Sequence, residues 1–251
     1  MAPTHCVPHV ACQTRPLSVT APADLGLFPG APVVRETPPY NYGSAIDGVG
    51  ADHKALGRAP FRSLLERDMR TLLGANPAID CYAVEPHTLH YFMPNGRGGF
   101  DQHEYVPDVV CRYRAGPVVV VDAKALYLSS RPSWQAREPH IREAYELDHR
   151  VAFVVLDETD IRVEPRLSNC QILERHRYIV RDDEALARVR DALLAVGFPT
   201  TVREVVHEAG LKSVPGTCRA FTALLNLALG GEVFLDLGAP FAPDTTVWRG
   251  L

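Results

Sequence analysis

Hydrophobic and polar positions follow regular periods from about residue 58 onward. In residues 60–74 the apolar positions share one helical face, which predicts a helix with Pro60 as its first residue and Gly74 as its end. Segments 81–92, 104–114 and 118–123 are rich in β-favouring residues and predict three strands, the first of them broken near Pro86. Turns are expected at "MPNGRGGF" and at Ala115-Gly116-Pro117.

The next segments predict a charged helix and another buried strand. Residues 134–149 have a roughly helical pattern with Pro139 inside it, and residues 151–156 ("VAFVVL") form a short apolar run. The order helix, three strands, helix, strand indicates an α/β fold with a mixed sheet that is flanked by helices.

The remaining segments predict a different kind of domain. Residues 182–197, 201–210 and 215–231 favour helices, the second of them capped by Thr200 or Thr201, and "EVFLDLGAPFAPDTTVWRG" favours a β-hairpin. Three helices followed by a hairpin are the layout of a winged helix. Residues 1–57 are rich in Pro and Gly and show no sustained period. We therefore expect an extended arm at 1–57, a catalytic domain at 58–180 and a winged-helix-like domain at 181–251.

Composition excludes few classes of protein. The chain has 251 residues, 46% of them hydrophobic, and a formal net charge of −4 at pH 7. A net acidic chain argues against a non-specific DNA-coating protein, so any DNA contact must come from local basic patches. No apolar run is long enough for a membrane span, and the first residues do not resemble a signal peptide.

Six scattered cysteines are typical of reduced thiols in a cytoplasmic protein. Four possible zinc ligands, His5, Cys6, His9 and Cys12, lie within eight residues. Their spacing matches no common zinc finger, so a flexible arm is the favoured interpretation of this segment.

Charged residues at the ends of two apolar strands need a chemical explanation. Thirteen residues separate Asp108 from Asp122, enough for one strand, a turn and a returning strand. Strand alternation places Asp122 and Lys124 on one face. Two neighbouring carboxylates repel unless a cation lies between them, and Mg²⁺ prefers such oxygen ligands. Glu66, at the rim of the predicted helix, could add a third carboxylate, and Lys124 could hold an attacking water.

This Glu…Pro-Asp…Asp-x-Lys pattern resembles the PD-(D/E)xK nuclease superfamily, and the predicted order of elements agrees with its core. A closer resemblance is to the TnsA family of transposon end-cleaving endonucleases. It rests on "FRSLLERDMRTLLGANPAI", "VEPHTLHYF" and "HEYVPDVVCRYRAGPVVVVDAKAL". It covers residues 58 to 180 by motif and 181 to 251 by layout only.

The resemblance implies a restriction-endonuclease-like fold and a site with Asp108, Asp122, Lys124 and Glu66 as catalytic residues. Asp108, Asp122, Glu66 and the backbone carbonyl of Ala123 would hold Mg²⁺, which Mn²⁺ could replace. Many relatives have Glu or Gln where this chain has the shorter Asp122. Glu85 is expected to be a structural residue behind the site.

The resemblance further implies hydrolysis of the non-transferred strand at transposon 5′ ends, in double-stranded DNA. The expected partners are a DDE-type transposase subunit and an AAA+ regulator ATPase that contacts residues 181–251, in the bacterial cytoplasm. Only one arginine, Arg219, lies in the predicted recognition helix, which favours protein contact over base reading there. Basic residues around the site are candidates for DNA contact: Arg112, Arg114, Arg131, Arg137, Arg142, Arg150, Arg175, Arg177 and Arg181.

Two alternatives remain. One is a restriction, repair or phage nuclease with the same core. The other is a catalytically inactive DNA-binding or assembly module, against which the complete set of Glu66, Asp108, Asp122 and Lys124 argues.

Overall fold

The computed structural model describes residues 25–35, 47–177, 181–212 and 217–250. The chain divides into two compact units. The first contains the described residues up to Arg70 together with 78–161, and the second contains 71–77 and the described residues from 162 onward.

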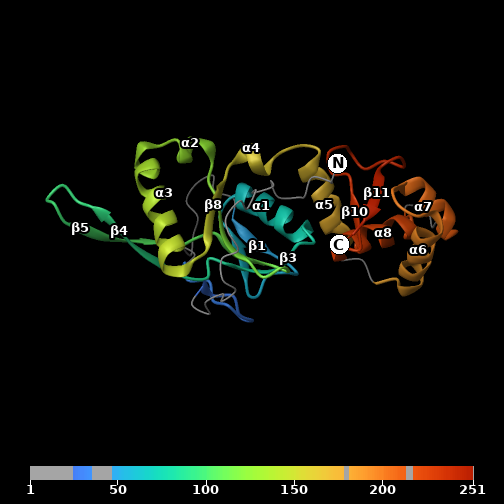
Figure 1. Ribbon diagram of the computed structural model, residues 1–251, viewed down its shortest axis with the longest axis horizontal. Helices are drawn as coiled ribbons and strands as arrows, with labels where there is room; N and C mark the ends of the chain where they lie inside the picture. Colours follow the sequence, from blue (N-terminus) through green and yellow to red (C-terminus); the bar gives the residue numbers. More distant parts are fainter. Residues whose placement is uncertain (1–24, 36–46, 178–180, 213–216, 251) are drawn as a thin grey trace. The chain divides into compact units, whose positions relative to one another are not determined.

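A four-stranded mixed sheet organises the first unit. Its strands are β3 (Ile79–Val84), β6 (Val109–Tyr113), β7 (Val118–Ala123) and β8 (Ala152–Leu156), in the spatial order β3-β6-β7-β8. The first three are antiparallel neighbours, and β8 is parallel to β7. This confirms the expected mixed sheet with helices around it (Figure 1).

Four helical segments accompany this sheet in the chain. They are α1 (Leu64–Ala75), α2 (Leu126–Ser129), α3 (Pro132–Ala144) and α4 (Glu158–Ile161), and a π-helical turn, η2 (Tyr145–His149), continues α3. α3 begins at Pro132 and contains Pro139 in its interior. It lies alongside β8, the strand that the β7–β8 crossover adds to the sheet (Figure 1).

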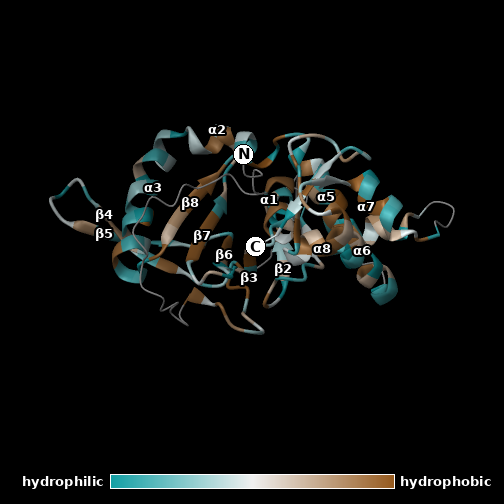
Figure 2. Ribbon diagram, turned by 45° about the vertical axis from the view of Figure 1, so that its right-hand side comes forward, coloured by the Kyte–Doolittle hydropathy of each residue, from teal (hydrophilic) through white to brown (hydrophobic). Residues whose placement is uncertain are grey.

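The core of this unit forms between α3, η2 and the sheet. Tyr145 stacks on Phe153 with ring centroids 5.5 Å apart, and both side chains are buried together with Ile141, Val110 and Val120. Strands β7 and β8 are largely hydrophobic, whereas α3 presents hydrophilic residues (Figure 2). A strand such as β7, apolar at successive positions, is typical of a sheet that is covered on both faces.

A separate two-stranded ribbon interrupts the meander. β4 (Leu89–Pro94) pairs with β5 (Phe100–Tyr105), and the ribbon extends away from the sheet (Figure 1). The prediction of one strand over 104–114 was therefore wrong. Pro107 cannot donate to a ladder, so the chain breaks there and β5 pairs locally while β6 joins the main sheet.

The start of α1 also differs from the prediction. Pro60 lies in β2 (Ala59–Phe61), which pairs with β1 (Gly48–Gly50), and α1 begins only at Leu64. The β1–β2 pair crosses the expected domain boundary at residue 57. Leu25, from the segment expected to be an extended arm, is completely buried in the core.

The second unit combines helices with a small antiparallel sheet. Its helices are α5 (Arg166–Arg177), α6 (Asp183–Val196), α7 (Val202–Ala209) and α8 (Arg219–Gly230), and its strands are β9 (Thr200–Thr201), β10 (Val233–Leu235) and β11 (Thr246–Arg249), in the order β10-β11-β9. α8 is the central helix, because eight of its twelve residues are buried. Of the helices described, none combines the length and apolarity that crossing a membrane would require.

Thr201 is the N-cap residue of α7 and forms a reciprocal cap with Glu204. It is one of the two residues that the sequence predicted for this role. Its hydroxyl accepts from the Glu204 N–H at 3.3 Å, and the Glu204 carboxylate accepts from the Thr201 N–H at 3.0 Å. We expect Thr201→Ala to lower the free energy of unfolding by about 1 kcal/mol, because the Glu204 N–H loses its side-chain acceptor. Urea denaturation measures this. Ser168→Ala, at an exposed position of α5, is the control and should change stability by less than about 0.5 kcal/mol.

Candidate functional site

The pairing of β6 with β7 brings the two strand-end aspartates together. Val109 lies opposite Val121 in this hairpin, so the next position outward places Asp108 opposite Asp122. Gly116 makes the return possible, with a φ of 104° that L side chains rarely adopt. The predicted approach of the two carboxylates is confirmed.

Reciprocal hydrogen bonds hold both aspartates in place. The backbone N–H of Asp108 donates to Oδ1 of Asp122 at 3.1 Å, and the N–H of Ala123 donates to Oδ2 of Asp108 at 2.8 Å. Asp122 is 0% exposed and Asp108 is 7% exposed. The backbone at the end of the hairpin thus fixes the position of each carboxylate.

Lys124 supplies a positive charge on the same face. Its Nζ lies 3.1 Å from Oδ2 of Asp122, as strand alternation predicted. The ammonium also lies 4.5 Å from the ring centroid of Trp134 in α3. Oδ2 of Asp122 still receives no well-aligned hydrogen bond within the described part of the chain. The Lys124 ammonium is therefore held between the Asp122 carboxylate and the Trp134 indole. Oδ2 of Asp122 can still accept a hydrogen bond or bind a cation.

Glu66 lies at the start of α1 and caps it. The Ser63 hydroxyl accepts from the Glu66 N–H and donates to Oε1, each at 3.1 Å, and the Arg62 N–H donates to Oε2 at 2.7 Å. Burial raises the pKa of Glu66 despite these hydrogen bonds. The Ser63-x-x-Glu66 spacing is that of a capping box, so this helix start is visible in the sequence itself. Both carboxylate oxygens of Glu66 already have donors.

Glu85 has the contacts of a structural residue. Its buried carboxylate accepts from Arg62 Nε at 2.7 Å and Nη2 at 2.8 Å, and Arg35 Nη1 lies 3.0 Å away. Its backbone N–H donates to the carbonyl of Asp108 at 3.0 Å, with a φ of 45° at Glu85. Glu85 therefore connects the arginines to the backbone of Asp108.

The electrostatics of the site are dominated by buried negative charge. Burial raises the pKa of Asp108 well above its usual range, and the carboxylates of Asp122 and Glu66 raise it further. Lys124 acts in the opposite direction but does not offset them. Burial, followed by the charges of Asp122 and Asp108, also raises the pKa of Tyr105. In the folded site, the carboxyl groups of Asp108, Asp122 and Glu66 outnumber the single ammonium of Lys124.

The oxygen atoms at this site are of the kind that binds a hard divalent cation. Carboxylate and carbonyl oxygens at Asp108, Asp122 and Ala123 are the ligands that Mg²⁺ takes, usually with several waters. Among the described residues, no three His, Cys, Asp or Glu side chains are grouped so as to hold a metal. Two carboxylates and water would therefore carry the coordination, with Glu66 acting through water. The His5, Cys6, His9 and Cys12 cluster lies outside the described residues.

Several of the arginines that were expected to face DNA have protein partners. Arg112 pairs with Asp80, Arg142 and Arg177 pair with glutamates one helical turn away, and Arg181 pairs with Asp183. Arg137 donates to the Tyr91 hydroxyl at 2.7 Å. These contacts leave fewer free cations than the sequence indicated. The cysteines Cys81, Cys111, Cys170 and Cys218 are free thiols, as expected.

Two aromatic residues at the site were not anticipated. Trp134 and Tyr105 lie 4.5 Å and 6.0 Å from Lys124 Nζ, measured to their ring centroids, and 6.0 Å from each other. Tyr105 shares the Tyr-x-Pro-Asp motif with Asp108, so its position could have been inferred. No local pattern indicates Trp134, because α3 reaches Lys124 only through tertiary packing.

Comparison with known proteins adds no family assignment. No family model matches this chain, and no curated protein sequence matches it significantly.

The buried acid pair leads to a prediction about stability. The raised pKa of Asp108 means that the folded state binds its proton more tightly than the unfolded chain. The resulting stabilisation is complete below the unfolded pKa, near about 4, and is lost as pH rises through the folded pKa. Asp108→Asn removes this loss, so without divalent metal it should stabilise the protein at pH 8 by on the order of 1–3 kcal/mol, and by less at pH 4.

Urea denaturation in EDTA at both pH values measures this effect. Asp80→Asn is the matched control, because Asp80 is exposed and its ion pair with Arg112 lowers its pKa. That control should be neutral or slightly destabilising, by at most about 1 kcal/mol. A stability loss in Asp108→Asn at pH 8 equal to that at pH 4 would contradict the electrostatic interpretation.

Proposed function

We propose that this protein is a metal-dependent DNA endonuclease, and that it is the end-cleaving subunit of a heteromeric transposase. The observation that carries the proposal is the convergence of Asp108, Asp122 and Lys124 at one end of the β6–β7 hairpin. Buried like charges without a full set of counter-charges destabilise a fold, so their presence favours a functional role.

Each residue has a distinct part in the proposed reaction. Asp108, Asp122 and the Ala123 carbonyl would hold Mg²⁺, with Glu66 contributing through water. When bound, the ion would stabilise charge on the phosphate and favour ionisation of a water. The Lys124 ammonium, fixed by Asp122 and Trp134, would orient that water or a phosphate oxygen. The water oxygen loses a proton to solvent and bonds to phosphorus. The bond from phosphorus to one bridging ester oxygen breaks, and that oxygen takes a proton from solvent and leaves as a hydroxyl.

A basic cavity beside Glu66 supports binding of a DNA backbone. This cavity of about 470 Å³ is lined by three arginines, Arg35, Arg58 and Arg62, and by one acid, Asp47, together with Val33 and residues of β1 and β2. Arg35 and Arg62 contact Glu85, whereas Arg58 is exposed and has no ion pair among the described residues. Backbone contacts of this kind position DNA without reading its sequence.

The second unit supports a protein partner better than a DNA groove. The order of its elements, α6-β9-α7-α8-β10-β11, is consistent with a winged helix, with α8 as the recognition helix. Arg219, at the start of α8, pairs with Asp182 and Glu184 at 2.7 Å each, and this pairing lowers the pKa of Asp182 to about 2. An arginine engaged in this way is not free to read bases. We propose that this unit contacts an AAA+ regulator.

Cleavage itself tests the proposal. Asp108→Ala and Lys124→Ala should each reduce Mg²⁺-dependent nicking of a plasmid carrying transposon ends by at least about 100-fold, because each removes a group at the reacting phosphate. Glu66→Gln keeps one oxygen acceptor at the cap and should have a smaller effect, because Glu66 is proposed to contact the ion only through water. Gel quantification of nicked product, with and without a DDE transposase, measures the rates.

Two exposed positions away from the site provide matched controls. Asp80→Ala and Lys212→Ala should nick at the parent rate. Parent-level cutting by both Asp108→Ala and Lys124→Ala would refute the assignment. Cutting that is sequence-specific but independent of the transposase would favour a restriction or repair nuclease instead.

A further inference from the structure

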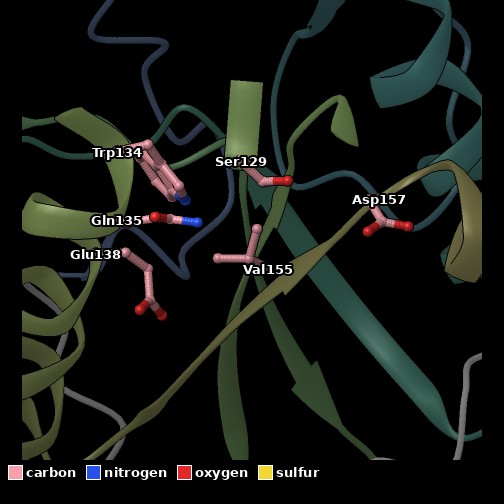
Figure 3. Close-up of a pocket in the computed structure, with 6 residues that line it drawn as sticks. All are labelled: Ser129, Trp134, Gln135, Glu138, Val155 and Asp157. Atoms are coloured by element: carbon pink, nitrogen blue, oxygen red, sulfur yellow. The ribbon is translucent and has the colours of Figure 1, made fainter. Parts of the chain in front are cut away.

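A small cavity with both polar and apolar lining lies next to the candidate site, on the side of α3 and β8. Its volume is about 260 Å³, and it is lined by Ser129, Trp134, Gln135, Glu138, Val155 and Asp157. Trp134, Gln135 and Glu138 come from the same helix, with Val155 on the strand between them and Asp157 (Figure 3). The three helical side chains therefore form one wall, and the strand forms the floor.

Two contacts connect this cavity to the candidate site. The indole of Trp134 lies 4.5 Å from Lys124 Nζ, so one side chain belongs to both. Val155 is the register partner of Asp122 in the parallel β7–β8 pair. A group bound in the cavity would therefore lie next to a phosphate held by Lys124.

The lining side chains restrict which ligand can bind. Glu138 and Asp157 are acids, which disfavour a phosphate or carboxylate in the cavity. Glu138 pairs with Arg142, and Asp157 accepts from Thr159, so these acids are already oriented. Gln135 is exposed, and its side chain has no hydrogen bond or ion pair among the described residues. One aromatic wall with several acceptors suits a flat ring that carries amino donors.

The volume agrees with a single ring system. A cavity of 260 Å³ corresponds to the liquid volume of roughly eight or nine waters. One base fits into such a space, whereas a stacked base pair does not. Enzymes that act on nucleic acid can accept a base that has left the stack, by stacking it on aromatic side chains and bonding its polar edge.

We propose that this cavity is a subsite for one unstacked nucleobase whose amino group lies at pyrimidine C4 or purine C6, which is cytosine or adenine, next to the cleaved phosphate. The identification of the ligand as part of a cleaved DNA rests on the proposed nuclease function. Trp134 provides the stacking surface, and Gln135 and Glu138 accept hydrogen bonds from the amino group. Thymine, which has an oxygen at the corresponding position, meets acceptors there and binds more weakly.

Tryptophan fluorescence tests this subsite without cleavage. The chain has two tryptophans, Trp134 and Trp248, so Trp248→Phe leaves Trp134 as the reporter. In EDTA, titration with dCMP or dAMP should quench Trp134 saturably. The dissociation constant for dTMP should be at least about fivefold higher, because a matched hydrogen bond is lost. Equal quenching by deoxyribose 5-phosphate, or no quenching by any nucleotide, would overturn the subsite.

Two variants locate the binding site. Gln135→Leu removes the amide at an exposed position and should weaken dCMP binding about fivefold to tenfold. Val155→Phe fills the cavity and should abolish quenching. Gln171→Leu, at an exposed position of α5, is the matched control and should bind like the parent. Circular dichroism checks that each variant is folded, and quenching that is unchanged in folded Gln135→Leu and Val155→Phe would overturn the proposal.

Failure of the subsite can be distinguished from failure of the nuclease proposal. If the parent nicks DNA in an Asp108-dependent way but shows no nucleotide-dependent quenching, the subsite is overturned and the nuclease assignment stands. If quenching follows the predicted order and is lost in Val155→Phe while no DNA is cut, the base-binding cavity stands and the nuclease assignment falls.

Discussion

The interaction on which the rest of the site depends is the enforced proximity of two buried carboxylates, Asp108 and Asp122. Their own backbone holds them there, since Asp108 N–H donates to Asp122 and Ala123 N–H donates to Asp108. Burying like charges is unfavourable, and one lysine compensates only in part, as the raised pKa of Asp108 indicates. The fold therefore maintains a local electrostatic strain that a bound cation would relieve.

The surrounding elements are arranged so that this strain is tolerated. β6 and β7 are apolar strands in the interior of the sheet, and their pairing keeps the two aspartates in register. β8 pairs in parallel with β7, and α3 packs beside it so that Trp134 lies near Lys124. The Trp134 ring then holds the Lys124 ammonium in place. Glu85 and its arginines hold the backbone on the other side of Asp108. Geometry, rather than a full set of counter-charges, keeps the acids in place.

The sequence predicted the hairpin and its acids because both depend on local spacing. A strand of alternating side chains with a Gly-Pro turn fixes which residues lie opposite each other, so Asp108, Asp122 and Lys124 followed from position alone. The break at Pro107 and the start of α1 at Leu64 were missed, although Pro107 and the Ser63-x-x-Glu66 capping box were visible signals. The Trp134 cavity could not be inferred, because it forms only when residues 129–138 pack against β8. Local pattern specifies the acids, and tertiary packing specifies what surrounds them.

Calorimetric titration of the metal-free protein with Mg²⁺ or Mn²⁺ tests the central claim most directly. We expect the parent to bind the cation and to release protons, because binding displaces the proton from the Asp108 carboxyl, whose pKa is raised. Repeating the titration in buffers of different ionisation enthalpy detects this proton release. Asp108→Asn should bind far more weakly and release no proton, while Asp80→Asn should behave like the parent. No binding to the parent, or equal binding by Asp108→Asn, would contradict the claim that this acid pair is a cation site.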